Sequence, residues 1–271
     1  MQKNFFILFY VLFIGSVAFS AVVKKKPLST QKSEPVINST VPTSTPTPAF
    51  PDRNLSYYEI GKTDGPVTYT QKIQYEKLPT GNLQIKSTTV DPKGKLMFNE
   101  TIVTQGSHVI SQSADVQQTQ RHLELEVKDD HVYFRTRALG PDHKGRTEDP
   151  KEDIEKLPPN FITGALVEAF ALEHFDELMA GDTVHAKMGI MEIREILSFK
   201  FWKKEVSKID GHEVMVVAMK PSSIFISMLL NNFYLYIDLK EKKMIHFVGR
   251  TPLWKEVDGD LKALDSEIVF E

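Results

Sequence analysis

An alternation of apolar and polar residues with a period of two runs through most of the chain after residue 66. The apolar positions of residues 67–75 all fall on one face of an extended chain: Val67, Tyr69, Ile73 and Tyr75. Successive side chains of a β-strand point to opposite faces, so this pattern is typical of an antiparallel strand with one buried and one solvated face.

The same alternation predicts further strands, separated by turn sequences rich in Gly, Asp, Asn and Pro. In the first half they cover residues 83–90, 96–102, 109–116, 123–127 and 131–136. In the second half they cover residues 184–193, 196–206, 213–219, 233–239, 244–249 and 261–270. Residues 140–159 contain Gly, Pro and many charges, and we expect them to form the loop that connects two meanders.

One segment, Phe161 to Ala180, has a helical period instead. Asn160 follows two prolines and can cap the start of a helix, and Gly181 can end it. Because this segment is apolar over more than half of its circumference, it needs cover on several sides. We therefore predict an all-β to α+β fold, in which a strongly curved antiparallel sheet (a half-barrel) wraps one long central helix at about residues 160–180.

The first fifty residues predict export. Lys3 precedes the apolar run 5–17, and small residues around Ser20 suit cleavage by a signal peptidase after that residue. Residues 21–53 are rich in Ser, Thr and Pro and predict a disordered tether. The expected organisation is thus a signal peptide at 1–20, a tether at 21–53 and a single folded domain at 54–271. If Ser20 is not cleaved, residues 5–23 are just long enough to anchor the chain in a membrane.

The composition of the chain restricts its expected cellular location and its expected binding partners. The chain has no cysteine, which excludes disulfides, thiolate metal sites and cysteine nucleophiles. Together with export, this favours the bacterial periplasm or cell envelope. The net charge is only −3 and no basic face is evident, so we expect no nucleic-acid partner. The lysine cluster at 24–26 is either the solvated end of the tether or a contact with anionic lipid headgroups at a membrane surface.

Several short sequence motifs in the predicted folded domain resemble those of a known protein family. They are Leu157-Pro158-Pro159-Asn160, Gly181-Asp182, the IDGHEV sequence at 209–214, Tyr236-Ile237-Asp238 and the VGRTPL sequence at 248–253. Over residues 55–271 the chain resembles a bacterial periplasmic family of unknown function, whose half-barrel sheets are similar to those of lipoprotein-carrier proteins. The resemblance implies that fold and implies no catalytic residues.

No motif in the sequence predicts a catalytic residue, a metal site or a cofactor. His212-Glu213 begins like a zinc-protease HExxH motif, but Val216 stands where the second histidine ligand is needed. His174 near Asp176 is an alternative metal or acid–base site, although a solvated helix face explains it as well. These observations favour a non-enzymatic domain and leave a hydrolase with a scattered active site as the third hypothesis.

The apolar run 224–230 is either buried on both sides or a hydrophobic lip that meets a lipid, a membrane or a partner. As the first hypothesis, we expect an exported domain that binds or carries an apolar ligand such as a lipid or lipopeptide. The second hypothesis is an envelope scaffold or protein-interaction domain with a filled core, of undefined oligomeric state. The residues expected to contact an apolar ligand are Phe170, Phe199, Trp202, Phe225 and Met228.

Overall fold

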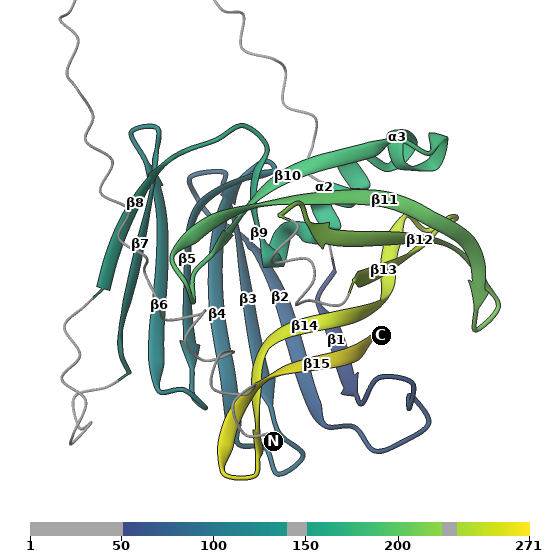
Figure 1. The fold of residues 1–271 in the computed structure, drawn as a ribbon, viewed down its shortest axis with the longest axis horizontal. Helices are drawn as coiled ribbons and strands as arrows, with labels where there is room; N and C mark the ends of the chain where they lie inside the picture. The colour runs from purple at the N-terminus through teal and green to yellow at the C-terminus, as the bar shows by residue number, and fades with distance from the viewer. Residues whose placement is uncertain (1–50, 140–150, 224–231) are drawn as a thin grey trace, which may run out of the picture. The chain divides into compact units, whose positions relative to one another are not determined.

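The computed structural model describes residues 51–139, 151–223 and 232–271, which all belong to one compact unit. Within these residues, fifteen strands form one continuous sheet in the order β8-β7-β6-β5-β4-β3-β2-β1-β15-β14-β13-β12-β11-β10-β9 (Figure 1). Neighbouring strands pair antiparallel, except that β9 and β10 pair in parallel. The chain therefore forms two meanders that join where β1 pairs with β15.

The strands of the first meander are β1 (Arg53–Tyr58), β2 (Tyr69–Lys77), β3 (Leu83–Val90), β4 (Leu96–Gln105), β5 (His108–Val116), β6 (Arg121–Lys128), β7 (His131–Ala138) and β8 (Lys151–Lys156). Those of the second meander are β9 (Phe161–Thr163), β10 (Thr183–Ile190), β11 (Glu195–Ile209), β12 (His212–Pro221), β13 (Phe233–Asp238), β14 (Lys243–Val257) and β15 (Asp260–Phe270).

The predicted fold class is wrong in its central feature, because the described residues, which include 160–180, form no long helix within the sheet. Residues 161–180 form strand β9, the 3-10 turn η1 (Gly164–Leu166) and two short helices, α2 (Val167–Glu173) and α3 (Phe175–Ala180). Phe161 to Thr163 are extended because they pair with β10, and Asn160 takes a left-handed turn conformation with φ 54° instead of capping a helix. His174 separates the two helices, and Gly181, at φ 97°, ends the second.

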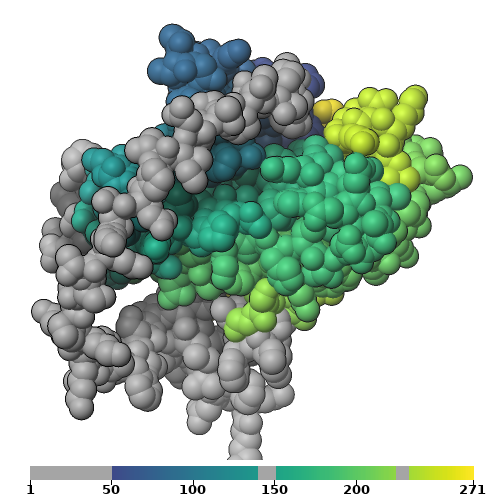
Figure 2. Space-filling model, turned by 90° about the horizontal axis from the view of Figure 1, so that it is seen from above, coloured from purple at the N-terminus to yellow at the C-terminus, as the bar shows by residue number. Residues whose placement is uncertain are grey.

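The sheet curls so that its two ends approach each other. Strand β9 contacts β5, and β11 contacts β8, although these strands lie far apart in the sheet order. In Figure 1, β10 and β11 run across the strands of the first meander, and Figure 2 shows residues of the α2–β11 segment, in green, on the visible surface. We call the face of the sheet enclosed by this curl the inner face.

Side chains from both meanders fill one core on the inner face. Most of its deeply buried large side chains come from strands, among them Leu123, Leu125, Phe134, Phe201, Met215 and Leu235, and Leu178 of α3 is buried with them. The two short helices therefore contribute to this core together with the strands, although neither is the long central helix that was expected. Among the residues that the structure describes, none of the helices has the length and apolar character needed to cross a membrane.

Candidate ligand-binding site

A pocket of about 420 Å³ lies between α2, the chain leading into β9 and the adjacent ends of β5 and β6. We call it the α2 pocket. Its apolar walls are formed by Val109, Val127, Leu157, Ile162, Leu166 and Phe170. Its polar residues are Ser107, His108, Asn160, Glu173 and His174. Most of the apolar residues are buried, whereas the polar ones are exposed except for the half-buried His174, so the pocket has an apolar interior and a polar rim.

Local sequence explains why the chain forms this pocket. Pro158 and Pro159 cannot donate backbone hydrogen bonds, and the residue before a proline avoids the helical conformation, so the chain stays extended after β8. The carbonyl of Asn160 accepts a hydrogen bond from the Lys187 amide at 3.0 Å, which fixes the entry into β9. The following turn η1 then directs α2 toward the ends of β5 and β6.

A buried ion pair anchors α2 to the sheet. Nη1 of Arg53 donates to both carboxylate oxygens of Glu168, at 3.0 and 2.8 Å, and the two side chains are only 8% and 13% exposed. The same carboxylate accepts the Met244 amide at 2.7 Å, and Nη2 of Arg53 donates to the Met244 carbonyl. Because Glu168 lies in the first turn of α2, its charge also interacts favourably with the helix dipole. The position of α2 is therefore set by β1 and β14.

The polar rim includes two histidines, His108 and His174, and the described residues form no cluster of metal ligands. Nδ1 of His174 lies 2.8 Å from Oε1 of Glu177, and its ring lies 4.5 Å from that of Phe170. Across the described ranges, no three His, Asp or Glu side chains are placed to hold a metal ion together. His174 is therefore positioned to contact a polar group of a ligand that enters the pocket.

The structure places the expected ligand-binding residues in different surroundings. Phe170 lines the α2 pocket and packs on Phe201, with ring centroids 5.1 Å apart. Phe199 lies on the inner face beside Phe233, and Trp202 lies on the opposite face under Lys200; neither lines this pocket. Phe225 and Met228, like the whole run 224–230, lie outside the described residues. Ligand binding by these five residues stays a prediction.

Sequence reasoning missed the wall that faces α2. Val109 and Val127 lie in predicted strands. However, a period-two pattern does not predict which strand ends will contact α2, which lies about forty to sixty residues further along the chain. Leu157 and Ile162 lie in the stretch that was read as the end of a loop and the start of a helix. The Pro158-Pro159 pair was the available signal, since it requires an extended chain before residue 160.

A second polar group lies on the inner face of the first meander. Glu100 accepts a hydrogen bond from Nε2 of Gln112 at 2.6 Å and lies within 3.5 Å of the Ser87 hydroxyl. Burial, together with the charge of Glu192, raises the pKa of Glu100 to about 7. Burial also raises the pKa of Glu192, which lies in the turn between β10 and β11. Glu100 is therefore partly protonated near neutral pH, and the surroundings of Glu192 also favour its neutral form.

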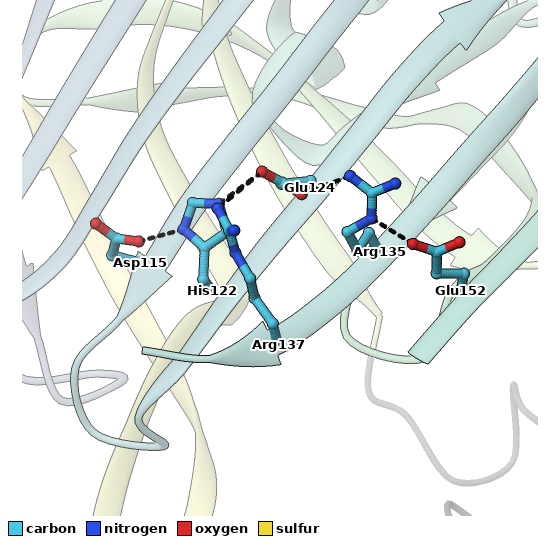
Figure 3. A network of polar contacts seen from close by, with 6 residues as sticks. All are labelled: Asp115, His122, Glu124, Arg135, Arg137 and Glu152. Carbon is cyan, nitrogen blue, oxygen red and sulfur yellow. Dashed lines mark hydrogen bonds and ion pairs between the residues drawn. The ribbon is translucent and has the colours of Figure 1, made fainter. Parts of the chain in front are cut away.

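The outer face of β5–β8 carries a network of ion pairs (Figure 3). Glu124 is its centre: it lies 3.0 Å from Nε2 of His122 and 3.1 Å from Nη2 of Arg137. The network continues to Asp115 through His122 and to Glu152 through Arg135, each across one pair of strands. Because the arginines are about half exposed, each pair contributes little to stability, and the network mainly favours the observed strand register.

No protein-family model matches the chain, and no curated protein matches it. Among solved structures it is similar to a β-barrel-like protein of the domain of unknown function DUF1849 from Brucella abortus, with a TM-score of 0.32 and 8% identity over 81% of this chain and 93% of that one. It is also similar to a DUF1329 family protein from Desulfovibrio piger, with a TM-score of 0.21 and 8% identity over 83% and 85% of the two chains. Membership of a family stays a prediction. At these TM-scores neither neighbour informs the function of this chain.

Proposed function

We propose that this domain binds a small molecule with an apolar body, such as a lipid tail, in the α2 pocket. The observation that carries the proposal is the pocket itself: about 420 Å³, with buried apolar walls and an exposed polar rim. Ligand pockets commonly measure about 300–1,000 Å³ and combine apolar walls with a few polar groups. The polar rim, which includes His108 and His174, would contact the head of such a ligand while its tail enters the pocket.

Binding of this kind depends on the hydrophobic effect. Each CH₂ group that moves from water into the pocket contributes about 0.8 kcal/mol, which corresponds to about a fourfold change in Kd. Affinity should therefore rise with chain length until the pocket is full. Such a dependence distinguishes burial in a pocket from polar recognition at the rim.

Export is part of this proposal. The N-terminal sequence supports it through the apolar run 5–17 and the small residues around Ser20. An exported domain of this kind would act as a carrier or receptor for envelope lipid or lipopeptide in the periplasm.

Isothermal titration calorimetry with 1-hexanol, 1-octanol and 1-decanol tests the binding. We expect Kd to fall about fourfold per added CH₂. Ala169 lines the pocket, so Ala169→Trp should fill it and weaken binding of 1-octanol at least tenfold. Ala165 belongs to the same segment but is exposed and does not line the pocket, so Ala165→Trp is the matched control and should bind normally.

Equal affinity of the two tryptophan variants, or an affinity independent of chain length, would contradict the proposal. Native mass spectrometry of protein purified from an envelope fraction then separates the remaining alternatives. A defined oligomer without bound lipid would favour an envelope scaffold, whereas co-purified lipid would favour a carrier.

A further inference from the structure

The outer face of β10–β12 carries a row of basic side chains that crosses three strands. In the sheet register, His185 of β10 lies beside Lys200 of β11, and Lys200 lies beside Lys220 of β12. We call these three residues the basic row. They point away from the core, because Phe199 and Phe201, which flank Lys200 in the sequence, are buried in it. Two lysine side chains thus lie directly opposite each other on the exposed side of the sheet.

Carboxylates do not balance the charges at this row. A further lysine, Lys187, lies two residues from His185 on the same face, and its Nζ donates to the Ser198 hydroxyl at 2.6 Å. Among the ion pairs that the described residues form, none includes Lys187, Lys200 or Lys220. Like charges directly opposite each other destabilise a pair of strands. The stability of the sheet therefore does not account for the basic row.

The outer face of the first meander has the opposite arrangement. There, carboxylates alternate with basic side chains from strand to strand, as in the network around Glu124 (Figure 3). Arg135, for example, lies between Glu124 and Glu152. The chain as a whole has a net charge of −3. The basic row is thus a local excess of positive charge on a weakly acidic protein.

An aromatic side chain adjoins the row. Trp202 lies two residues from Lys200 on the same face and is half-buried, and Nζ of Lys200 lies 5.5 Å from the centre of its ring. Tryptophan is enriched where a membrane meets water, with its ring at the level of the lipid headgroups. Lysine is a compact charge and lacks the planar fork with which arginine binds one phosphate, so a row of lysines suits a surface with many negative charges.

From this arrangement we infer that the outer face of β10–β12 docks on a membrane whose surface carries anionic lipid headgroups. The basic row contacts the headgroups, and Trp202 enters the interface beside them. Docking at this face does not require a ligand in the α2 pocket. Nδ2 of Asn160, on the rim of that pocket, donates to the His185 carbonyl at 3.4 Å. If the proposed function holds, docking would therefore bring the rim close to the lipids that the pocket binds.

Co-sedimentation of the full chain with vesicles tests the docking. Vesicles of phosphatidylcholine and phosphatidylglycerol in equal amounts should bind the protein more tightly than vesicles of phosphatidylcholine alone. The double variant Lys200→Gln/Lys220→Gln should bind the anionic vesicles at least tenfold more weakly, since each lysine near an anionic surface changes affinity about fivefold. Lys93→Gln/Lys95→Gln removes the same charge from the exposed turn between β3 and β4 and is the matched control, which should bind normally. Lys200→Arg/Lys220→Arg keeps the charge and should also bind.

The fluorescence of Trp202 locates the contact. In Trp254→Phe, Trp202 is the remaining tryptophan, and phosphatidylcholine with brominated acyl chains should quench it when it is mixed into the anionic vesicles. Circular dichroism establishes that each variant is folded. Unchanged affinity of the double glutamine variant for anionic vesicles, or an unquenched Trp202, would overturn the inference.

Two further measurements identify what binds. Binding of inorganic phosphate or dextran sulfate without binding of vesicles would overturn the assignment to a membrane. Ala169→Trp, which tests the α2 pocket, should leave vesicle binding unchanged, so failure of the docking and failure of the proposed function are distinguishable.

Discussion

Glu100 is a carboxyl group whose surroundings favour its neutral form. In the folded protein its pKa is raised from 4.5 to about 7, first by burial, while the hydrogen bonds from Gln112 and Ser87 oppose this rise. A pKa that is higher in the folded than in the unfolded state means that the folded protein binds the proton more tightly. This carboxyl group therefore favours folding at low pH, and its contribution is lost as the pH rises from about 4.5 through 7.

We expect Glu100→Gln to remove this pH dependence. The free energy of unfolding of the variant relative to the wild type should increase by about 2 kcal/mol between pH 5 and pH 8, because the wild-type carboxylate must ionise within the protein. Urea denaturation at both pH values measures the difference. Glu126→Gln, on the outer face, should leave the pH dependence as it is in the wild type. A Glu100→Gln variant that follows the wild-type pH profile would show that this carboxyl group titrates normally.

The segment between β8 and β10 shows how single contacts fix an element that is too short to be stable alone. Helix α2 has seven residues, and isolated helices of that length do not persist in water. Its position depends on buried apolar side chains such as Phe170 and on the buried pair of Glu168 with Arg53. Loss of one charge would leave the other buried without a partner.

Glu168→Ala should therefore destabilise the protein by about 3–5 kcal/mol. A double-mutant cycle with Arg53→Ala, followed by urea denaturation, should yield a large coupling energy, because the second mutation removes the stranded charge. Glu76 and Lys86 form a comparison pair, 3.0 Å apart but about half exposed, and their cycle should yield less than about 1 kcal/mol. Similar coupling energies for the two pairs would contradict the anchoring role of Glu168.

The sequence predicts those strands that have one buried and one solvent-exposed face. The predicted strand 83–90 coincides with β3, and the predicted strand 131–136 lies within β7. Strand β8, with the sequence KEDIEK, was read as part of a loop, because it is exposed on both faces and lacks any alternation. Strand β1 was not predicted either. Most of its residues are buried, so it too lacks an alternation of buried and exposed positions.

The prediction of a helix at residues 160–180 is wrong because the spacing of apolar residues does not indicate which segments pair as strands. Ile162 fits a helical period, but Ile162 and Thr163 are both β-branched and pair in parallel with β10. This pairing spans more than twenty residues of sequence and has no local signal. Of the three expected ligand-binding residues that the structure describes, only Phe170 lies in the pocket wall, because the strand ends that complete the wall depend on how the sheet curls.

The curl of the sheet depends on close contact between its two ends. At Gly189 an added Cβ would lie 2.9 Å from Cζ of Phe161 and 3.0 Å from Cδ1 of Leu125, so a methyl group requires the neighbours to move. Gly164, by contrast, has open space around its Cα and an ordinary φ. The absence of a side chain at 189 thus permits β10 to approach β6.

We expect Gly189→Ala to lower the free energy of unfolding by about 1–3 kcal/mol, the usual cost of overpacking a core. Gly164→Ala is the control and should change stability by no more than about 1 kcal/mol. Thermal and urea denaturation of both variants measure the effect. If Gly189→Ala were as stable as Gly164→Ala, the two ends of the sheet would not be packed as closely as described.

Binding of an apolar molecule in the α2 pocket is tested most directly by locating the ligand. Methyl-resolved NMR of the full chain, labelled at Val, Leu and Ile, follows each wall during titration with 1-octanol. The largest shifts should occur at Val109, Val127 and Leu166, while the core residues Val217 and Leu235 should not respond. Shifts confined to residues away from the α2 pocket, or no saturable shift at all, would contradict the proposed function.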